Sequence, residues 1–336
     1  MTVSHAEFIE GKGRSSDHGA IGVCRICGGP LARAFRVREM MFGTREEFQY
    51  HQCADCDCLQ IDVVPADIGR HYPTNYYSYD LGRHHQWKRW RRGLRRRWIL
   101  TAPGGVSAVL GVFSGSDELF HLYRSIGVKP GCRLLDVGAG SGGHVLELRD
   151  AGMTGAVGVD PFVLKDVLHE GRILVHRMEL GEMAGAYDFL TFHHSLEHMP
   201  DQIGALSQAK CLLAPAGKVL LRIPTVTSDA FEHYRENWVN LDAPRHYYLH
   251  SHRSLTIAAS KAGLRILRLW CDSSAMQFMG SEQYLRDISL TDPRSEAYGR
   301  AGGLFTSAQR RVYSRKTAKL NSAVRGDTIC ALFCSI

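Results

Sequence analysis

Residues 132–160 read CRLLDVGAGSGGHVLELRDAGMTGAVGVD, and the order of patterns in this stretch predicts the fold. A short apolar run ends at Val137 and is followed by a glycine-rich turn. A segment with the spacing of a helix comes next, and a second apolar run ends at Asp160. A strand, a glycine-rich turn, a helix and a second strand in this order form the nucleotide-binding unit of α/β proteins.

The glycines of the turn, Gly138, Gly140 and Gly142, bear on which cofactor such a unit takes. Because glycine has no Cβ, the backbone can turn sharply and approach a ligand closely. Dinucleotide sites usually have Gly-x-Gly-x-x-Gly and place the pyrophosphate at the helix N-terminus. In this chain the third glycine comes one residue earlier. Asp136 precedes the turn, where a carboxylate would repel a pyrophosphate, and Asp160 can accept hydrogen bonds from a ribose diol.

The segment DVGAGSGG at 136–143 resembles motif I of the class I S-adenosylmethionine (SAM) methyltransferases. The resemblance implies a Rossmann-like α/β fold with a seven-stranded sheet. It also implies that Asp136 faces the ammonium of SAM, that the glycines cradle the cofactor and that Asp160 holds the ribose. A dinucleotide, or a glycine-rich turn without a ligand, remains the alternative. The resemblance implies further cofactor contacts from Pro161, Glu179 and His193.

Later segments follow in the order that this family has. The resemblance covers roughly residues 115–336, which we expect to form the methyltransferase domain. It implies that the last two strands form an antiparallel pair at the sheet edge. The segments are a fourth strand at 187–192, the loop HHSLEHMPD at 193–201, which resembles an LEH-x-x-D motif, a strand at 218–223, and final strands at 264–270 and 326–333.

The whole chain has 336 residues, which suits two domains or one large domain with an appendage. No run approaches the ~20 apolar residues that span a bilayer. The first 20 residues are polar, so we expect them to be disordered and not a signal peptide. Five of the ten cysteines crowd into 24–58 and the others are scattered. This usage predicts a cytoplasmic protein without disulfides.

Much of the net charge of +7 lies in residues 87–98, WKRWRRGLRRRW, which hold seven basic residues and three tryptophans. We expect a helix here, within a connector or lid at 66–114. A solvated connector would explain the composition. The segment also suits contact with anionic phosphates, on a nucleotide-linked or lipid-linked acceptor or at a membrane surface. Interleaved Arg and Trp also suit single-stranded nucleic acid, but one short run does not favour it.

Two Cys-x-x-Cys pairs, Cys24 with Cys27 and Cys53 with Cys56, predict a zinc-binding module at 21–65. Four thiolates suit tetrahedral zinc and leave no open position for water, so the metal would be structural. Free cysteines or a redox pair are the alternatives, although a redox pair should open a helix in a βαβ unit. The spare ligand candidates are His51 and Cys58.

A zinc module before a methyltransferase domain resembles the zinc-binding methyltransferases of deoxysugar, polysaccharide and natural-product pathways. The tyrosine-rich segment 72–79 matches the stretch that joins the two parts in those proteins. Their sugar C-methyltransferases extend well past the seventh strand, whereas this sequence ends at Ile336. We therefore expect O-methylation to be at least as plausible as C-methylation.

Three histidines are candidates to remove a proton from the acceptor, because histidine titrates near neutral pH. His198 is the first choice, since it follows the expected fourth strand at the edge where an acceptor would approach. His194 is the second, and an orienting role for the loop is the alternative for both. His246 and Arg245 lie in NWVNLDAPRHYYLH, which resembles a lid of the same family. Tyr76 could cover the cofactor sulfonium.

The predicted function is SAM-dependent methyl transfer to a small-molecule acceptor, such as a sugar, a glycan precursor or a secondary metabolite. A nucleic-acid methyltransferase is one alternative, with the zinc module and the basic run as its grip. The fourth-strand loop lacks the Asn/Asp-Pro-Pro-Tyr/Phe motif of base N-methylation. A SAM-binding module without catalysis is the other alternative, and the intact DVGAGSGG disfavours it.

Overall fold

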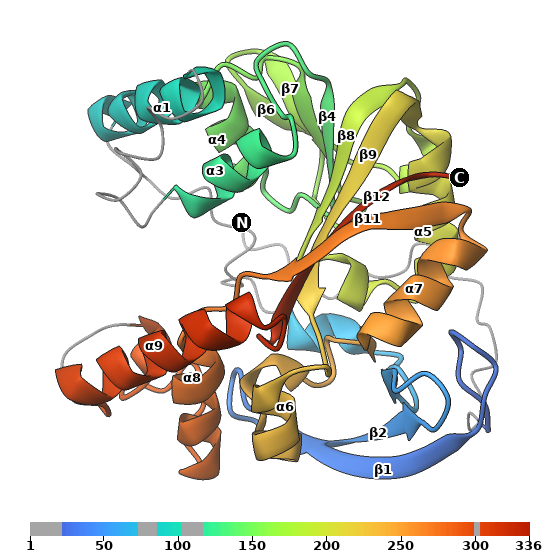
Figure 1. The fold of residues 1–336 in the computed structure, drawn as a ribbon, viewed down its shortest axis with the longest axis vertical. Coiled ribbons are helices and arrows are strands. Elements are labelled where there is room, and N and C mark those ends of the chain that lie inside the picture. The colour runs from blue at the N-terminus through green and yellow to red at the C-terminus, as the bar shows by residue number, and fades with distance from the viewer. Residues whose placement is uncertain (1–21, 73–85, 103–116, 299–302) are drawn as a thin grey trace, which may run out of the picture. The chain divides into compact units, whose positions relative to one another are not determined.

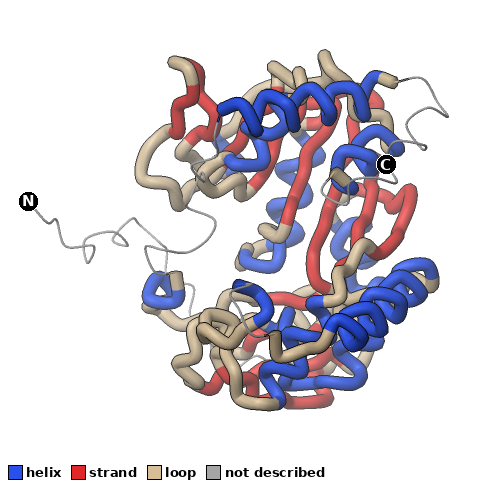
Figure 2. Tube along the Cα trace, turned by 90° about the vertical axis from the view of Figure 1, so that its left-hand side faces the viewer, coloured by secondary structure: helices blue, strands red, loops and turns tan. Residues whose placement is uncertain are grey.

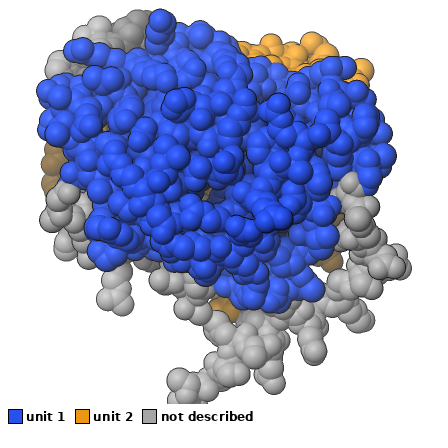
Figure 3. Space-filling model, turned by 90° about the horizontal axis from the view of Figure 1, so that it is seen from below, with its two compact units in different colours: residues 1–74, 225–254, 273–327 blue, residues 75–224, 255–272, 328–336 orange. Residues whose placement is uncertain are grey.

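The computed structural model describes residues 22–72, 86–102, 117–298 and 303–336. The expected disordered segment 1–20 and the candidate Tyr76 lie outside these residues. The chain divides into two compact units, coloured separately in Figure 3. Unit 1 combines 1–74, 225–254 and 273–327, and unit 2 combines 75–224, 255–272 and 328–336.

Unit 2 is built around a mixed sheet with the order β11-β12-β9-β8-β4-β5-β7-β6 (Figure 1). The strands from β9 to β7 run parallel, and the expected antiparallel pair of β11 and β12 is confirmed at one edge. The strands are β4 (Leu134–Val137), β5 (Ala156–Val159), β6 (Val167–His169), β7 (Arg172–His176), β8 (Tyr187–His193), β9 (Leu213–Pro224), β11 (Leu264–Cys271) and β12 (Thr328–Ser335).

The prediction of seven strands was wrong, because this sheet has eight among the described residues. The additional strand, β6, forms an antiparallel hairpin with β7 at the edge opposite β11. Glu170 and Gly171 make the turn, with φ angles of 52° and 73°. Positive φ at both central residues is typical of the turns that join two-residue hairpins.

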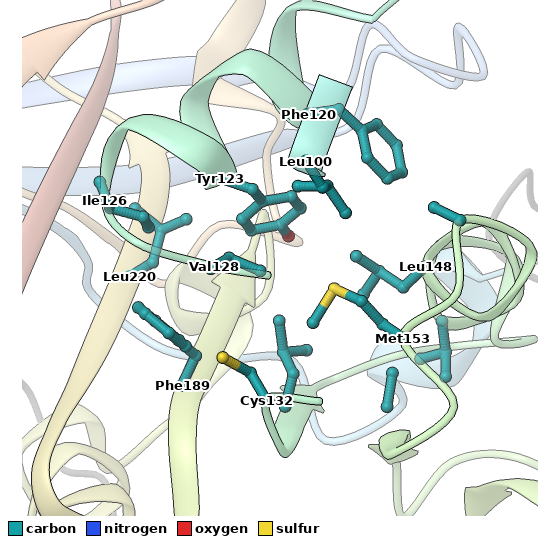
Figure 4. Packing of buried hydrophobic residues seen from close by; sticks show 14 of the residues in the cluster. Leu100, Phe120, Tyr123, Ile126, Val128, Cys132, Leu148, Met153, Phe189 and Leu220 are labelled. Atoms are coloured by element: carbon teal, nitrogen blue, oxygen red, sulfur yellow. The ribbon is translucent and has the colours of Figure 1, made fainter. Parts of the chain in front are cut away.

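Helices cover both faces of the unit 2 sheet (Figures 1 and 2). Every residue of the central strand β4 is buried, as expected for a parallel strand covered on both sides. The main apolar core lies between the sheet and the helices α1, α3 and α4 (Figure 4). The helices are α1 (Gln86–Thr101), α3 (Glu118–Ser125) and α4 (Gly143–Asp150) on one face, and α5 (Gln202–Cys211) and α7 (His252–Lys261) on the other.

Unit 1 contains a four-stranded antiparallel sheet with the order β1-β2-β3-β10. Its last strand comes from the segment that follows β9, about 190 residues after β3 in the chain. Segments within the expected methyltransferase domain at 115–336 therefore contribute to the unit that holds the cysteines. The elements are β1 (Leu31–Arg38), β2 (Glu47–Cys53), β3 (Leu59–Ile61), β10 (Tyr248–Leu249), α6 (Asp229–Tyr234), α8 (Met276–Leu285) and α9 (Ser307–Ser322).

Candidate functional site

The glycine-rich turn of unit 2 packs so tightly that side chains are excluded at two of its positions. Gly138, Gly140 and Gly142 all have positive φ, between 53° and 83°. A Cβ on Gly138 would lie 2.5 Å from the Cβ of Ser195, and one on Gly142 would lie 2.7 Å from Cγ2 of Val175. The sequence pattern therefore reflects a local requirement for glycine, since other residues rarely adopt this backbone conformation.

Asp160 closes the turn from the end of β5. Its Oδ2 accepts a hydrogen bond from the Gly140 N–H at 2.8 Å, and its Oδ1 accepts one from the Phe162 N–H at 2.8 Å. Burial raises the pKa of Asp160, and the two backbone N–H groups oppose that shift. Each carboxylate oxygen has a second lone pair that a ligand hydroxyl could use. The sequence is right in bringing Asp160 to the glycine turn.

Asp136 lies within β4, and only 3% of its surface is exposed. The Thr191 hydroxyl on β8 donates to its Oδ1 at 2.7 Å. Burial raises the pKa of Asp136 to about 7, with a smaller contribution from the charge of Asp160, while the Thr191 bond opposes the shift. A carboxyl that is close to half protonated at neutral pH becomes fully charged when a cation binds beside it.

A buried tyrosine joins two histidines beside the turn, a feature that sequence patterns did not indicate. The Tyr123 hydroxyl on α3 lies 2.5 Å from Nε2 of His144 and 2.6 Å from Nε2 of His193. Burial lowers the pKa of His144 to about 4 and that of His193 well below its usual value, so both rings are neutral. One hydroxyl can donate to only one of them, so the other ring must donate to the tyrosine oxygen.

His194 is held by charged neighbours at both ring nitrogens. Its Nε2 accepts a hydrogen bond from Nη1 of Arg222 at 2.5 Å, and its Nδ1 lies 3.3 Å from Oε1 of the buried Glu197. Arg222 also donates to Asp272 at 2.6 Å. This arrangement fixes the His194 proton on Nδ1. A ring whose Nε2 lone pair is already used is poorly suited to take a proton from an acceptor.

The loop from 195 to 201 presents the other candidate of unit 2. His198 ends the short 3₁₀ helix η5 (Leu196–His198), and its side chain is partly exposed. Asp201 caps α5 by accepting a hydrogen bond from the Gly204 N–H at 2.8 Å. Glu197 is fully buried. The motif therefore has two residues with structural contacts and one, His198, that reaches the surface.

Two further predicted residues belong to unit 1. Arg245 is fully buried, and it donates to Glu39 at 2.8 Å and to Asp242 at 3.0 Å. The expectation that Arg245 faces an acceptor is therefore wrong, because it forms an internal ion pair. The Nδ1 of His246 lies 2.8 Å from the carbonyl oxygen of Asn240, and its side chain is 7% exposed.

The remaining cofactor candidates lie at the carboxyl ends of strands. Pro161 directly follows Asp160 after β5, and the next residue, Phe162, is 76% exposed. Glu179 is exposed, and it forms a capping box with Glu182 at the start of η4 (Leu180–Glu182). Sequence reasoning did not select Phe162, although an apolar residue after a ribose-binding acid is a recognisable signal.

The four predicted metal ligands in unit 1 converge. The Sγ atoms of Cys24, Cys27, Cys53 and Cys56 all lie within 4.8 Å of one another. The Cys24–Cys56 and Cys27–Cys53 pairs are 3.6 and 3.4 Å apart. A tetrahedron with metal–sulfur bonds of about 2.3 Å has sulfur–sulfur edges of about 3.8 Å, so the geometry fits zinc. Cys58 and His51 are not part of this group.

Backbone amides point at three of these sulfurs. The N–H groups of Ile26, Gly29 and Asp55 donate to Cys24, Cys27 and Cys53 at 3.3–3.4 Å. Such bonds stabilise negative charge on the sulfurs and orient them toward a common point. The cysteine turns are therefore organised for thiolates, as the sequence predicts.

Comparisons with known proteins agree with the unit 2 geometry. The family model described as "Methyltransferase domain" matches residues 79–269, which is more than half of the chain. Phosphoethanolamine N-methyltransferase 2 of Caenorhabditis elegans is 25% identical over 165 residues, covering 44% of this chain and 36% of that protein. The chain thus spans only about a third of the length of that relative.

Among solved structures, a SAM-dependent methyltransferase from Archaeoglobus fulgidus is 19% identical, with a TM-score of 0.40, and the match covers 68% of this chain and 99% of that one. A proposed sarcosine dimethylglycine methyltransferase from Galdieria sulphuraria is 14% identical, with a TM-score of 0.40 and coverage of 73% and 97%. The family match, together with the mixed α/β sheet, shows that this chain belongs to the methyltransferase-domain family and is a SAM-dependent methyltransferase.

Proposed function

We propose that the enzyme methylates a small-molecule acceptor, such as a sugar, a glycan precursor or a secondary metabolite, on oxygen or carbon. The observation that carries this proposal is the loop after β8. It offers a partly exposed histidine, His198, and it lacks the Asn/Asp-Pro-Pro-Tyr/Phe motif of nucleic-acid base N-methylation. A hydroxyl or carbon acid needs a nearby base, whereas a neutral amine does not.

The proposal is tested with radiolabelled SAM and three classes of acceptor: nucleotide-linked and lipid-linked sugars, phosphoethanolamine, and RNA. We expect label in the sugar class and none in RNA. Label in RNA alone would replace this proposal with the nucleic-acid alternative. Label in phosphoethanolamine alone would assign N-methylation of an amine, and the need for a base would disappear.

We propose that the cofactor pocket uses Asp160 for the ribose, Asp136 for the ammonium, and Gly138, Gly140 and Gly142 for close backbone approach. SAM supplies an electrophilic methyl group on a sulfonium. The exposed ring of Phe162 offers an apolar surface for the adenine. The further cofactor contacts proposed from sequence are Pro161, Glu179, His193 and Tyr76.

We propose that His198 takes the acceptor proton and that His194, locked by Arg222, orients Glu197 and the loop. His246 stays as a second candidate base. The acceptor must be held in line with the methyl group, and that positioning accounts for much of the rate. In this scheme the protein contributes orientation and proton removal.

We propose a structural zinc on Cys24, Cys27, Cys53 and Cys56. The convergent sulfurs and their backbone N–H donors support this assignment. All ten cysteines are free thiols, which supports a reducing compartment and hence a cytoplasmic location. No described helix is both long and apolar enough to cross a bilayer.

Replacing Asp160 with alanine should weaken SAM binding by about 1–3 kcal/mol, or roughly 5- to 150-fold, because the ribose loses a charged hydrogen-bond acceptor. Calorimetric titration with SAM measures the change. Asp188→Ala is a matched control, since Asp188 accepts a backbone hydrogen bond from Arg133 away from the turn. Equal losses in both variants would contradict the assignment, and so would tight binding of NAD in place of SAM.

SAM affinity should fall as the pH drops through neutrality. The pKa of Asp136 is raised to about 7, so the protonated form, which cannot pair with an ammonium, gains population below that pH. Between about pH 8 and pH 6 the affinity should fall roughly tenfold. Titrations across this range measure it. In Asp136→Asn the affinity should be low and independent of pH, and an unchanged pH dependence in that variant would assign the titration to another group.

A further inference from the structure

Helix α1 turns apolar side chains outward and arginines inward, the reverse of an ordinary surface helix. Trp87, Trp90 and Leu94 are 65%, 56% and 47% exposed. Together with Arg91, which is also exposed, they occupy positions i, i+3, i+4 and i+7 and form one stripe along the helix. We call these four residues the outer stripe.

Ion pairs on the opposite side fix the rotation of the helix. Arg89 donates to the carboxylate of Asp150 on α4 at 2.7 Å, and the buried Arg96 donates to Asp117 at 2.9 Å. Gly93 lies between these arginines, and a Cβ there would come within 2.5 Å of the Asp150 carbonyl oxygen. The helix is therefore seated directly on α4. It cannot roll to bury its tryptophans without breaking these contacts.

The outer stripe combines an aromatic surface with positive charge. The rings of Trp87 and Trp90 are stacked, with centroids 5.4 Å apart, and the guanidinium of Arg91 lies 6.0 Å from the Trp87 ring. Along its length α1 has seven basic residues and no acidic residue. Three of those cations, Arg89, Arg95 and Arg96, pair with acids of unit 2. Arg91 and Arg97 remain exposed.

We propose that the outer stripe docks the enzyme on a bilayer surface that contains anionic lipids. Tryptophan rings favour the level of the lipid headgroups, where one part of the ring is apolar and the N–H is hydrated. Arginines beside them gain from the negative surface potential of the bilayer. A helix of this kind lies in the interface plane and does not span it.

Single-stranded nucleic acid fits the same surface less well. Bases bind to aromatic rings whose faces are open. Here the two tryptophans cover one face of each other, and Leu94 extends the stripe with an aliphatic side chain. Neither feature offers a platform for successive bases, whereas both add apolar area to a membrane contact.

Sedimentation of the full-length enzyme with vesicles tests this proposal. We expect binding to mixed phosphatidylcholine–phosphatidylglycerol vesicles, little binding to phosphatidylcholine alone, and release at high salt. The double variant Trp87→Ser/Trp90→Ser should bind at least about tenfold more weakly, since two large apolar side chains are lost from the contact. Arg91→Ser should reduce binding by about fivefold.

A control pair on another surface is Leu285→Ser/Val312→Ser, because Leu285 and Val312 are 55% and 60% exposed on α8 and α9. It should bind vesicles as the wild type does. SAM titration of each variant verifies that unit 2 is folded, since the outer stripe is not part of the proposed cofactor pocket.

Quenching of wild-type tryptophan fluorescence by brominated phosphatidylglycerol needs no substitution, and we expect it to be strong. Absence of quenching, or equal vesicle binding by the wild type and the tryptophan variant, overturns the proposal. Tighter binding to single-stranded RNA, lost in the same variant, would assign the stripe to nucleic acid. Lipid binding is measured without any methyl acceptor, so these outcomes are independent of the proposed substrate.

Discussion

Cys24→Ser should remove the metal from the enzyme and unfold the cysteine turns of unit 1. The binding energy of a structural zinc is about 10–16 kcal/mol, which exceeds the stability of a typical small domain. The loss should spread to the 225–254 segment, because the Ser251 hydroxyl donates to the carbonyl oxygen of Cys56 at 2.5 Å. Metal analysis, thermal unfolding and limited proteolysis of purified protein measure these effects.

Cys58→Ala provides the matched control for this prediction. Cys58 is buried near the cluster but lies outside the group of four convergent sulfurs. That variant should retain about one zinc per chain, and SAM should still bind to unit 2 of Cys24→Ser. A wild-type protein that is isolated without metal and melts at the same temperature after chelation would remove zinc from the account.

His198→Ala should lower the rate of methyl transfer by about 10²–10⁴, the usual cost of losing a general base, while SAM affinity stays near that of the wild type. The separation follows from position. His198 is on the loop after β8, whereas Asp136 and Asp160, the proposed cofactor ligands, lie on β4 and after β5. Single-turnover rates with the true acceptor, together with SAM titrations, measure the two quantities.

The exposed His233 on α6 offers a control substitution, and His233→Ala should be fully active. His198→Ala that turns over normally would move the base elsewhere, with His194 and His246 next to be tested. Full activity in all three variants would mean that positioning alone supplies the rate, and the methyltransferase assignment would still stand.

The parts of the fold that the sequence predicted well are those set by near neighbours in the chain. The strand, glycine turn, helix and second strand at 132–160 lie within one unit, so periodicity and the glycines are enough to predict them. The four cysteines behave similarly, because each pair sits in its own tight turn. The β6–β7 hairpin escaped because its strand has only three residues, too few for a periodic signal.

The features that sequence could not predict depend on residues far apart in the chain. Arg245 was expected at a ligand, but Glu39, 206 residues away, neutralises it in the core. Likewise Tyr123 and His193 are 70 residues apart, and no local pattern brings the tyrosine hydroxyl to the ring. Charge and aromaticity identify polar groups, whereas the folded chain decides whether a partner or a ligand satisfies them.

The pairing of β3 with β10 has a consequence for how this enzyme could be altered or could diverge. An N-terminal module connected by a single linker can be deleted or exchanged between relatives as a cassette. In unit 1 the sheet that follows the cysteine turns is completed by Tyr248 and Leu249 from a later insertion. A chimera that replaces only the first 74 residues would therefore present a foreign edge to β10, so successful exchanges should require the 225–254 segment to move with its partner.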